Sequence, residues 1–500
     1  MNHKFLVLCA GCLLTFTTHN SAFAQNDFQS WNRFRGANGT GRYQGAPLPV
    51  QFGPKQNVLW STELPAGISS PCIWKDRIFL TGFDNANNKL LTICMNRKTG
   101  KFLWTKSVVP TQRPRIHPLN SPAASTPTTD GKLVYSYFGS YGIVCYDLEG
   151  DEIWTKKLSP SKNRHGSASS PILYKNLLIL VRDKGGVFVV DGSSQIFALN
   201  KETGEDVWIA KRAFAGTGWS TPTIWKHKKG TDLVVLGKRV IAYDPNTGKK
   251  KWWVDGLIDY SVTSPVFGEN RLFVCVAAGG LDEQNRIVLP KFAVLVNKFD
   301  RNRDKFIQPN EIPKDYLVYR GDSKGVDGDT MSLLQLFRLV DLNHDGKLGE
   351  KEWIGFQNSF LSDDNGLFAI RAGGTGNITR THVAWKTTRY LPEVPSPLYY
   401  NGHLYLIKNG GIVTCWNEKT GKTVYRRRLG VDSAFFASPV VGNGKIYVAS
   451  HKGVIAVFET GSKMKVLARN DLGESIVATP AIAQGCLYVR TEKRLYAFHR

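Results

Sequence analysis

Acidic residues and paired cysteines are scarce in this sequence, and both shortages restrict what the protein can be. The 500 residues include 41 Asp and Glu against 65 Lys and Arg, so the formal net charge is +24. From residue 25 onward, adjacent cysteines and Cys-x-x-Cys spacings do not occur, which excludes thioredoxin chemistry, zinc ribbons and c-type haem attachment. The charged fraction of 21% argues against a long coiled coil. With only 4 Met but 48 Gly and 13 Trp, the composition favours short strands joined by tight turns.

The first 24 residues have the pattern of a signal peptide. Lys4 precedes an apolar stretch over residues 5–16, and residues 22–24 (Ala-Phe-Ala) form a small-x-small cleavage site. That stretch is too short to span a bilayer, and no later one approaches about 20 apolar residues. We therefore expect an exported protein, periplasmic or secreted, without a transmembrane segment. The alternative is a lipid anchor on Cys12, because residues 10–12 (Ala-Gly-Cys) are similar to a lipobox.

Because we expect an exported protein, its positive charge is compatible with fewer kinds of partner. We do not expect nucleic acid as a partner outside the cytoplasm. An unknown protein or an anionic polysaccharide of the cell envelope fits a basic exported protein better. The alternative is a basic, soluble exterior with no specific partner, and in either case we expect a monomer.

A Ser-Pro or Thr-Pro step recurs eight times and divides the chain into repeats. Consecutive steps lie about 40–56 residues apart, except for one interval of 132 residues between Ser264 and Ser396. A unit of about 40–50 residues is the size of one four-stranded propeller blade. The steps begin at Ser70, Thr126, Ser170, Thr221, Ser264, Ser396, Ser438 and Thr479. The sequence therefore predicts an all-β fold, an eight-bladed β-propeller of four-stranded antiparallel blades.

Each repeat continues with the same internal pattern. An apolar run and an alternating strand lead to a third strand that contains one small residue. A Thr-Gly turn then leads to a Trp, as from Gly204 to Trp208, where Gly permits positive φ and the Trp covers the edge of the blade. The small residues are Cys94, Cys145, Ala198, Ala242, Ala369, Cys415, Ala456 and Ala497. Because Cys and Ala interchange there, we expect these three cysteines to be buried and free, whereas the sequence leaves the pairing of Cys72, Cys275 and Cys486 open.

The two ends of the chain complement each other. The eighth repeat stops at Arg500, just after its third strand, and lacks its Trp-containing strand. Residues 57–62 hold an additional strand with Trp60 in the corresponding place. We predict that this N-terminal strand becomes the outer strand of the last blade, which closes the ring and removes an open edge.

The interval of 132 residues places an insertion in blade five. The first two strands of that blade are expected near residues 265–277, and its small residue is Ala369. We therefore divide the chain into a signal peptide (1–24), an N-terminal extension (25–56), a propeller (57–277 and 366–500) and an insertion between the second and third strands (278–365).

Two segments of the insertion, 300–311 and 341–352, fit the twelve-residue EF-hand loop. In this loop, side-chain oxygens and one main-chain carbonyl wrap a calcium ion, with a bidentate Glu at the end. The predicted ligands are Asp300, Asn302, Asp304, Phe306, Gln308 and Glu311 in the first loop, and Asp341, Asn343, Asp345, Lys347 and Glu352 in the second. Lys305 stands where Gly346 makes the sharp turn, so the first loop is less regular. The alternative is a pair of surface turns rich in Asp and Asn.

This pattern resembles the PQQ-like β-propeller repeat proteins, which include the outer-membrane assembly factor BamB and the quinoprotein alcohol dehydrogenases. The resemblance covers about residues 28–290 and 366–500 and rests on the Ser/Thr-Pro steps and the Thr-Gly-to-Trp turns. Residues 31–41 (W-N-R-F-R-G-A-N-G-T-G) are similar to the start of secreted members. These motifs specify an architecture rather than a chemistry, because a fold does not fix a function.

The resemblance implies either a binding protein or an enzyme. The dehydrogenases carry a vicinal Cys-Cys disulfide over their quinone, which residues 25–500 lack, and no G-x-S-x-G nucleophile elbow occurs. The sequence therefore favours a non-catalytic scaffold or binding protein that holds Ca²⁺, and we do not expect PQQ as a cofactor. The alternative is a degenerate PQQ-dependent-type oxidoreductase.

Residues that precede the Ser/Thr-Pro steps should line one rim of the propeller. Aromatic rings beside basic groups there could hold a peptide or an anionic sugar. The candidates for this ligand face are Asn120, Arg164, His165, Trp219, Tyr260, Glu393, Phe435 and Phe436. The alternative is that these side chains only plug the channel.

Overall fold

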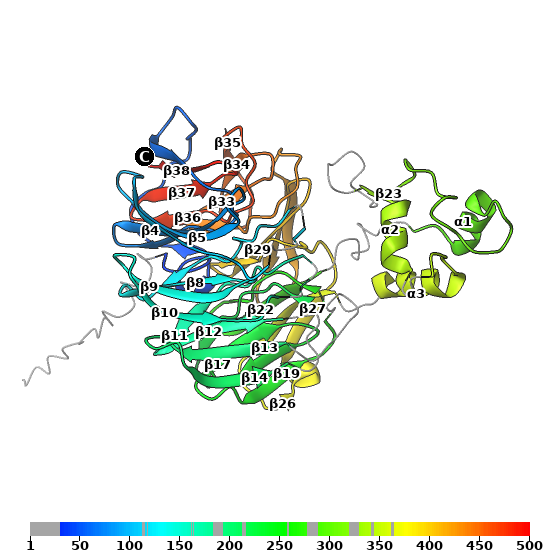
Figure 1. Ribbon diagram of the computed structural model, residues 1–500, viewed down its shortest axis with the longest axis horizontal. Coiled ribbons are helices and arrows are strands. Elements are labelled where there is room, and N and C mark those ends of the chain that lie inside the picture. Colours follow the sequence, from blue (N-terminus) through cyan, green and yellow to red (C-terminus); the bar gives the residue numbers. More distant parts are fainter. Residues whose placement is uncertain are drawn as a thin grey trace, which may run out of the picture.

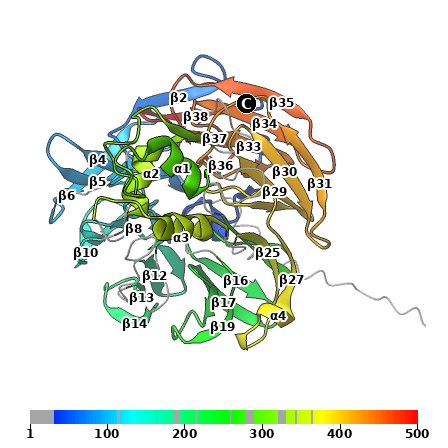
Figure 2. The ribbon, with the colours of Figure 1, turned by 90° about the vertical axis from the view of Figure 1, so that its right-hand side faces the viewer.

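The computed structural model describes residues 31–112, 116–117, 119–161, 163, 165–183, 194–212, 217–257, 260–277, 289–319, 330–341, 345–361 and 365–500. Eight antiparallel four-stranded blades surround a central axis, and Figure 2 shows the ring nearly face on. The predicted eight-bladed propeller is therefore confirmed. None of the helices in the described ranges is long and apolar enough to cross a membrane. The predicted signal peptide and Cys12 lie outside the described residues.

The strands of the first four blades follow one another in the chain. Blade one contains β3 (Cys72–Trp74), β4 (Arg77–Asp84), β5 (Lys89–Asn96) and β6 (Phe102–Val108). Blade two contains β7 (Thr128–Thr129), β8 (Leu133–Phe138), β9 (Gly142–Asp147) and β10 (Glu152–Lys157). Blade three contains β11 (Ile172–Tyr174), β12 (Leu177–Arg182), β13 (Gln195–Asn200) and β14 (Asp206–Lys211). Blade four contains β16 (Thr223–His227), β17 (Gly230–Leu236), β18 (Val240–Tyr243) and β19 (Lys250–Val254).

The other four blades include the interrupted one and the one that closes the ring. Blade five contains β21 (Val266–Phe267), β22 (Arg271–Val276), β25 (Gly366–Arg371) and β27 (Val383–Thr387). Blade six contains β28 (Leu398–Tyr400), β29 (His403–Lys408), β30 (Ile412–Asn417) and β31 (Thr423–Arg428). Blade seven contains β32 (Val440–Gly442), β33 (Lys445–Ala449), β34 (Val454–Glu459) and β35 (Val466–Asp471). Blade eight contains β36 (Ala481–Ala483), β37 (Cys486–Arg490), β38 (Arg494–Phe498) and β2 (Val58–Glu63).

Short elements outside this pattern lie in the connections. They are η1 (Ala37–Gly39), β1 (Arg42–Tyr43), β15 (Thr217–Gly218), β20 (Tyr260–Ser261), β26 (Gly376–Asn377) and α4 (Thr379–His382). β1 adds a parallel strand to blade seven next to β32, and β26 adds one to blade four next to β19.

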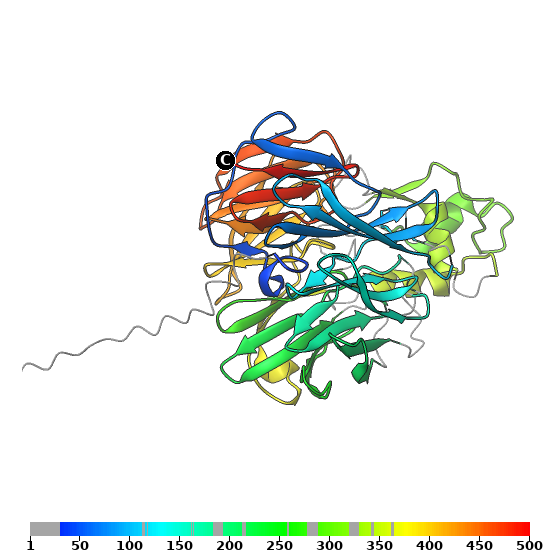
Figure 3. The same cartoon turned by 60° about the vertical axis from the view of Figure 1, so that its left-hand side comes forward.

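The N-terminal strand closes the ring as predicted. β2 pairs antiparallel with β38, and Trp60 lies opposite Ala497. Figure 3 shows β2 in blue beside the red C-terminal strands. The outer edge of blade eight is therefore covered by residues that the chain supplies from its other end.

The Ser/Thr-Pro steps form a belt of hydrogen bonds around the central channel. The main-chain N–H of Ser70 donates to the Thr126 hydroxyl of the next blade at 3.1 Å, and Thr479 of the last blade donates to Ser70 at 3.1 Å. Five further junctions repeat this bond at 2.9–3.0 Å. The recurring step thus ties the blades together at seven of the eight junctions of the ring.

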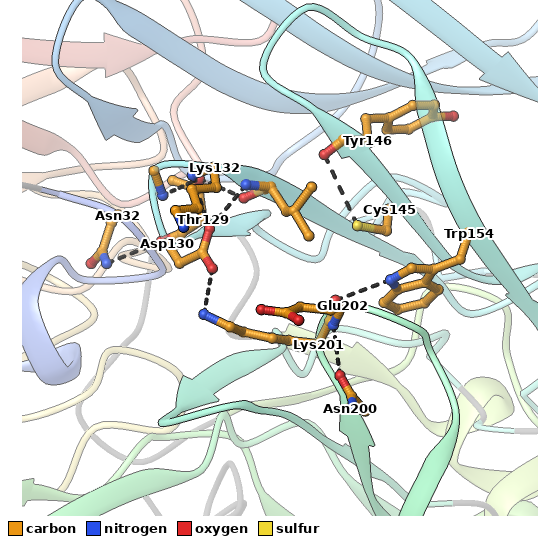
Figure 4. Close-up of polar contacts among 12 residues, drawn as sticks. Asn32, Thr129, Asp130, Lys132, Cys145, Tyr146, Trp154, Asn200, Lys201 and Glu202 are labelled. Atoms are coloured by element: carbon orange, nitrogen blue, oxygen red, sulfur yellow. Dashed lines mark hydrogen bonds and ion pairs between the residues drawn. The ribbon is translucent and has the colours of Figure 1, made fainter.

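A second set of contacts between blades lies farther out. The indole N–H of Trp154 in blade two donates to the Lys201 carbonyl of blade three at 3.0 Å, and its ring covers Gly204 in the same turn. Lys201 also forms an ion pair with Asp130 at 2.6 Å, and Figure 4 shows these contacts. Trp60, Trp104, Trp208 and Trp385 make the same bond to the turn of the following blade. The Trp of the repeat therefore covers the edge of its own blade and also binds that blade to the next one.

Seven of the eight small residues lie directly opposite an aromatic ring, and Ala456 lies opposite Arg469. Cys94 pairs with Trp104, Ala198 with Trp208, and Cys415 with Tyr425. A large ring on one strand leaves room only for a small side chain across from it. All six cysteines of the described residues are buried and free, as we expected for the three in this column. Burial raises the pKa of the Cys94 and Cys415 thiols to about 12.

Blade four departs from the pattern at Trp252. The Trp252 indole N–H donates within its own blade, to Asp232 at 2.8 Å, and its ring is fully buried against Trp225. Asp232 also contacts His227 at 3.0 Å and Lys251. The outer edge of this blade is covered by β26 instead. The sequence pattern could not distinguish this Trp from the others because its partner lies on another strand.

The N-terminal segment crosses the central channel. Asn32 donates to the Thr129 carbonyl of blade two at 3.1 Å, whereas Arg35 donates to the Pro397 carbonyl of blade six at 2.7 Å. Arg33 donates to the Pro222 carbonyl of blade four at 3.2 Å. Burial lowers the pKa of Arg33 to about 10 and that of Arg35 to about 9. Residues 31–35 therefore occupy the space between opposite blades.

Three helices lie between β22 and β25 in the chain and stand apart from the blades (Figure 1). They are α1 (Phe292–Phe299), α2 (Leu333–Val340) and α3 (Glu350–Leu361), and the hairpin β23 (Leu317–Tyr319) and β24 (Thr330–Ser332) precedes α2. They share a hydrophobic cluster of their own that includes Leu295, Leu336 and Trp353. This segment thus has a small core separate from those of the blades.

We predict that Trp60→Ala lowers the stability of the propeller by about 3 kcal/mol, because it removes the ring that joins β2 to blade one. Leu59→Ala, on the same strand but with a side chain that is 54% exposed, should change stability by less than about 0.5 kcal/mol. Calorimetric melting temperatures of the two variants test this. Equal melting temperatures would show that β2 does not close the ring.

Two glycines allow the cost of backbone strain to be measured separately from the contact between blades. Gly204 and Gly402 both have φ of +76°, but a Cβ at Gly204 would lie 2.6 Å from the Trp154 ring, whereas one at Gly402 would meet nothing within 4 Å. Gly402→Ala should cost only the strain of positive φ, about 1 kcal/mol. Gly204→Ala should cost about 1–3 kcal/mol more, because the ring must move. Thermal unfolding of both variants checks this difference, and equal losses would contradict the proposed role of the ring contact.

Candidate functional site

One face of the propeller collects the connections that differ most between blades. In an antiparallel blade the second and fourth strands run in the same direction, so both end at the same face. The residues before each Ser/Thr-Pro step follow a fourth strand, and the helical segment follows β22, a second strand. Figure 2, viewed from that side, shows α1, α2 and α3 in front of the ring. The candidate ligand residues and the helices therefore share this face.

Four side chains form a row of rings on this face, each from the connection before a different blade. The ring centroids of His117 and His165 lie 4.9 Å apart, those of His165 and Trp219 5.3 Å, and those of Trp219 and Tyr260 5.1 Å. Asn120 donates its amide to the His165 carbonyl at 2.5 Å. The structure thus brings together Asn120, His165, Trp219 and Tyr260. We call His117, His165, Trp219 and Tyr260 the ring row.

Main-chain bonds hold the ring row in place. The Trp219 indole N–H donates to the Gly166 carbonyl at 2.8 Å, and its main-chain N–H donates to the Ser261 carbonyl at 2.9 Å. β15 and β20 pair in parallel beneath it. His117 was not among the predicted residues, although it precedes Thr126 just as the others precede their own steps.

The remaining candidates on this rim do not belong to the ring row. Phe435 is only 1% exposed and packs into the hydrophobic cluster of blades six and seven. Phe436 contacts His451, with ring centroids 5.2 Å apart, and Glu393 is half-buried. Arg164 lies outside the described residues.

The first predicted calcium loop, residues 300–311, folds its main-chain amides toward its own acidic side chains. Asp300 Oδ2 accepts the N–H of loop position six at 2.9 Å, and Asp304 Oδ1 accepts that of position seven at 2.9 Å. Both oxygens of Glu311 accept N–H groups, from position two at 3.0 Å and from position nine at 2.8 Å. Asn302 Oδ1 accepts the Asp304 N–H at 2.9 Å. The bond from position seven lowers the pKa of Asp304.

The second predicted loop, residues 341–352, repeats these bonds at equivalent positions. Asp341 Oδ2 accepts the N–H of position six at 3.1 Å, Asp345 Oδ1 that of position seven at 2.8 Å, and Glu352 Oε2 that of position nine at 3.1 Å. Asn343 lies outside the described residues. α2 ends directly before this loop and α3 begins within it.

The two loops contact each other at equivalent positions. Ile307 and Leu348, each at position eight, exchange main-chain hydrogen bonds of 3.1 and 2.8 Å. The Lys347 ammonium lies 3.2 Å from Asp304 Oδ2, which also accepts the Gln308 amide at 3.2 Å. The Phe306 side chain is 40% exposed, with the Lys347 ammonium 5.5 Å from its ring centroid.

Some carboxylate oxygens of the two loops are suitable ligands for a hard cation. Oδ1 of Asp300, Oδ1 of Asp341 and Oε1 of Glu352 are buried and have no hydrogen-bond partner among the described residues. Carboxylate oxygens of this kind are the ligands that calcium prefers. However, no three His, Cys, Asp or Glu side chains of the described residues converge to form a ready metal cluster.

The comparisons with known proteins agree with this architecture. Solved structures with a similar fold include BamB from Moraxella catarrhalis, with 11% identity, a TM-score of 0.52 and coverage of 89% of this chain and 99% of that chain. A europium-containing methanol dehydrogenase has 10% identity, a TM-score of 0.55 and coverage of 94% and 98%. The quinohemoprotein alcohol dehydrogenase from Comamonas testosteroni has 14% identity, a TM-score of 0.52 and coverage of 94% and 80%. At such identities the likeness shows the fold alone.

The sequence itself matches a known family over two separate parts of the chain. No curated protein matches it significantly. The family model described as outer membrane protein assembly factor BamB matches residues 54–194, 380–464 and 409–500. These ranges lie within the blades and leave out the helical segment, which agrees with the resemblance to PQQ-like propellers. Because they cover more than half of the 500 residues, the chain belongs to this family of β-propeller proteins.

Proposed function

We propose that this protein is an exported, non-catalytic β-propeller scaffold that binds calcium through an EF-hand pair inserted in blade five. The export proposal rests on the signal-peptide pattern of residues 1–24 and on the family, whose description names outer-membrane protein assembly. The calcium proposal rests on the two loops. The face that carries the ring row would bind an envelope protein or an anionic polysaccharide.

One observation carries the calcium proposal: the two loops hold buried carboxylate oxygens without partners at equivalent places. Asp300 Oδ1 and Asp341 Oδ1 both belong to position one of their loops. Burying an unpaired carboxylate oxygen is costly unless a cation or donor compensates it. A calcium ion coordinated by the oxygens of each loop would supply that compensation, and its binding would draw the other predicted ligands inward.

The second loop is the better site for four reasons. Glu352 keeps one oxygen without a partner, whereas both oxygens of Glu311 accept main-chain N–H groups. Asp304 of the first loop is engaged by the Lys347 ammonium. Lys305 has φ of +65° at the sharp turn, where Gly346 adopts +75° without strain. Arg301 and Arg303 add positive charge near the first ion.

The side chains that fill the central channel support a function that does not use a quinone cofactor. Cofactor chemistry of the dehydrogenase type would need space in the channel, but Asn32, Arg33 and Arg35 cross it and bind the carbonyls of blades two, four and six. A rigid propeller with a filled channel is suited to binding partners on its faces and connections.

We predict that titration calorimetry of the protein shows two calcium sites, the tighter one in the second loop. Glu352→Gln should abolish the tighter site, and Glu311→Gln the weaker one, since each removes the bidentate ligand. Calcium modules outside the cell often have dissociation constants of about 10⁻⁴–10⁻³ M, so the weaker site should fall in or above that range.

Glu350→Gln is the matched control, because Glu350 is an exposed acid of α3 outside the predicted ligand set. It should leave both sites unchanged. Absence of calcium binding would refute the EF-hand pair. Loss of the tighter site in Glu311→Gln would reverse the ranking of the loops.

A second measurement addresses catalysis. We expect no dye-linked alcohol oxidation and no quinone absorbance retained by the protein after incubation with PQQ and calcium. Retained absorbance together with oxidation of an alcohol would support the alternative function, a degenerate quinoprotein-type oxidoreductase.

A further inference from the structure

A cavity of about 330 Å³ lies between blades three and four, apart from the ring row and the helical segment. The end of β14 forms one wall, and β18, β19 and the turn between β17 and β18 form the other. Its lining includes Lys211, Arg212, Lys238, Arg239, Lys250 and Trp253. This volume is at the lower end of the range for small-molecule pockets. The cavity therefore suits a small ligand or a single unit of a polymer.

The lining carries an excess of positive charge. Arg212 is paired with Asp183 at 2.8 Å, and Arg239 with Asp255 at 2.5 Å. Within the described residues, Lys211, Lys238 and Lys250 form no ion pair with an acidic side chain. Lys238 and Lys250 are exposed residues of the lining without an acidic partner among the described residues, so an anion at the cavity would compensate their charge.

Arg212 provides a fixed positive charge at one end of the cavity. Its guanidinium donates from Nε and Nη2 to the two Asp183 oxygens at 2.8 and 3.2 Å, and from Nη2 to the Leu236 carbonyl at 2.7 Å. The residue is only 4% exposed, and its Nη1 has no acceptor among the described residues. Because Nη1 is itself buried, this guanidinium adds a fixed positive charge behind the lining rather than an exposed donor.

An aromatic ring holds two of the other cations in position. The Lys250 ammonium lies 4.5 Å from the centroid of the Trp253 ring, and the Arg239 guanidinium carbon lies 6.0 Å from it. Cation–π contacts of this kind restrain flexible side chains. The positive charge of the cavity is therefore partly preorganised.

We propose that this cavity binds a phosphate or sulfate monoester of a small, sugar-sized molecule. A tetrahedral oxyanion presents several oxygens in different directions, which matches Lys238 and Lys250 of blade four together with the fixed charge of Arg212, directly after β14. A carboxylate has only two oxygens in one plane, so it reaches fewer of these groups than a tetrahedral ester with three free oxygens. The enclosing walls of two blades exclude a flat membrane surface from the cavity, so we assign a soluble ester rather than a lipid headgroup.

The test is titration calorimetry of the protein at low ionic strength, with a calcium chelator present. Glucose 6-phosphate and glucose 6-sulfate are the probes, glucuronate is the single-carboxylate control, and inorganic phosphate isolates the oxyanion. Both esters should bind more tightly than glucuronate, and added NaCl should weaken them. Lys238→Ala and Lys250→Ala should each reduce ester affinity about tenfold.

Lys249→Ala is the matched control, because Lys249 is an exposed neighbour of Lys250 that does not line the cavity. It should leave ester affinity unchanged, and melting temperatures without ligand verify that all variants fold. If Lys249→Ala and Lys250→Ala weakened ester binding equally, the effect would be general charge attraction, and the proposed site would be wrong. Tight glucuronate binding, no ester binding, or binding only to vesicles that contain phosphatidic acid would also overturn it.

Discussion

The belt of hydrogen bonds at the Ser/Thr-Pro steps is the constraint on which the rest of the structure depends. Seven of the eight hydroxyls accept the N–H of the blade before them, and the Pro that follows has no N–H to leave unpaired in the channel. Thr479 donates to Ser70, so the last blade is bound to the first. Ser264 donates to Ser396, so blade five keeps its place although a long segment interrupts it. The outer Trp contacts then fix how neighbouring blades meet.

Because the strands of the blades form this frame, the candidate functional side chains lie in the connections between strands. The ring row, the helical segment and the Arg212 end of the cavity all lie where second or fourth strands end, which places them on one face of the propeller. The opposite ends of the strands carry the tight turns that receive the Trp rings, as at Gly204. Most of those turns pack between blades, with an exception in blade five, where β26 and α4 lie between the third and fourth strands.

Opposite charges gather at two separate places on this frame. The predicted calcium loops contain buried carboxylate oxygens without partners among the described residues, whereas the lining of the cavity between blades three and four includes Lys211, Lys238 and Lys250. Ligands of opposite charge at the two places would not compete. The N-terminal segment fills the channel with Arg33 and Arg35, whose buried guanidinium groups donate to carbonyl groups of the described residues. Such a channel is built for rigidity rather than for passage.

The sequence alone determined the number of blades, their strand pattern and the closure by Trp60, because these features repeat or complement each other along the chain. It also indicated that Cys94 and Ala198 occupy small sites, but only the register showed that each faces a Trp ring. The partners of Arg35 and Trp252 were decided by the tertiary structure, since Pro397 and Asp232 follow no spacing rule. The cavity could not be predicted either, because its cations come from strands of two blades, and only their packing brings like charges to one place.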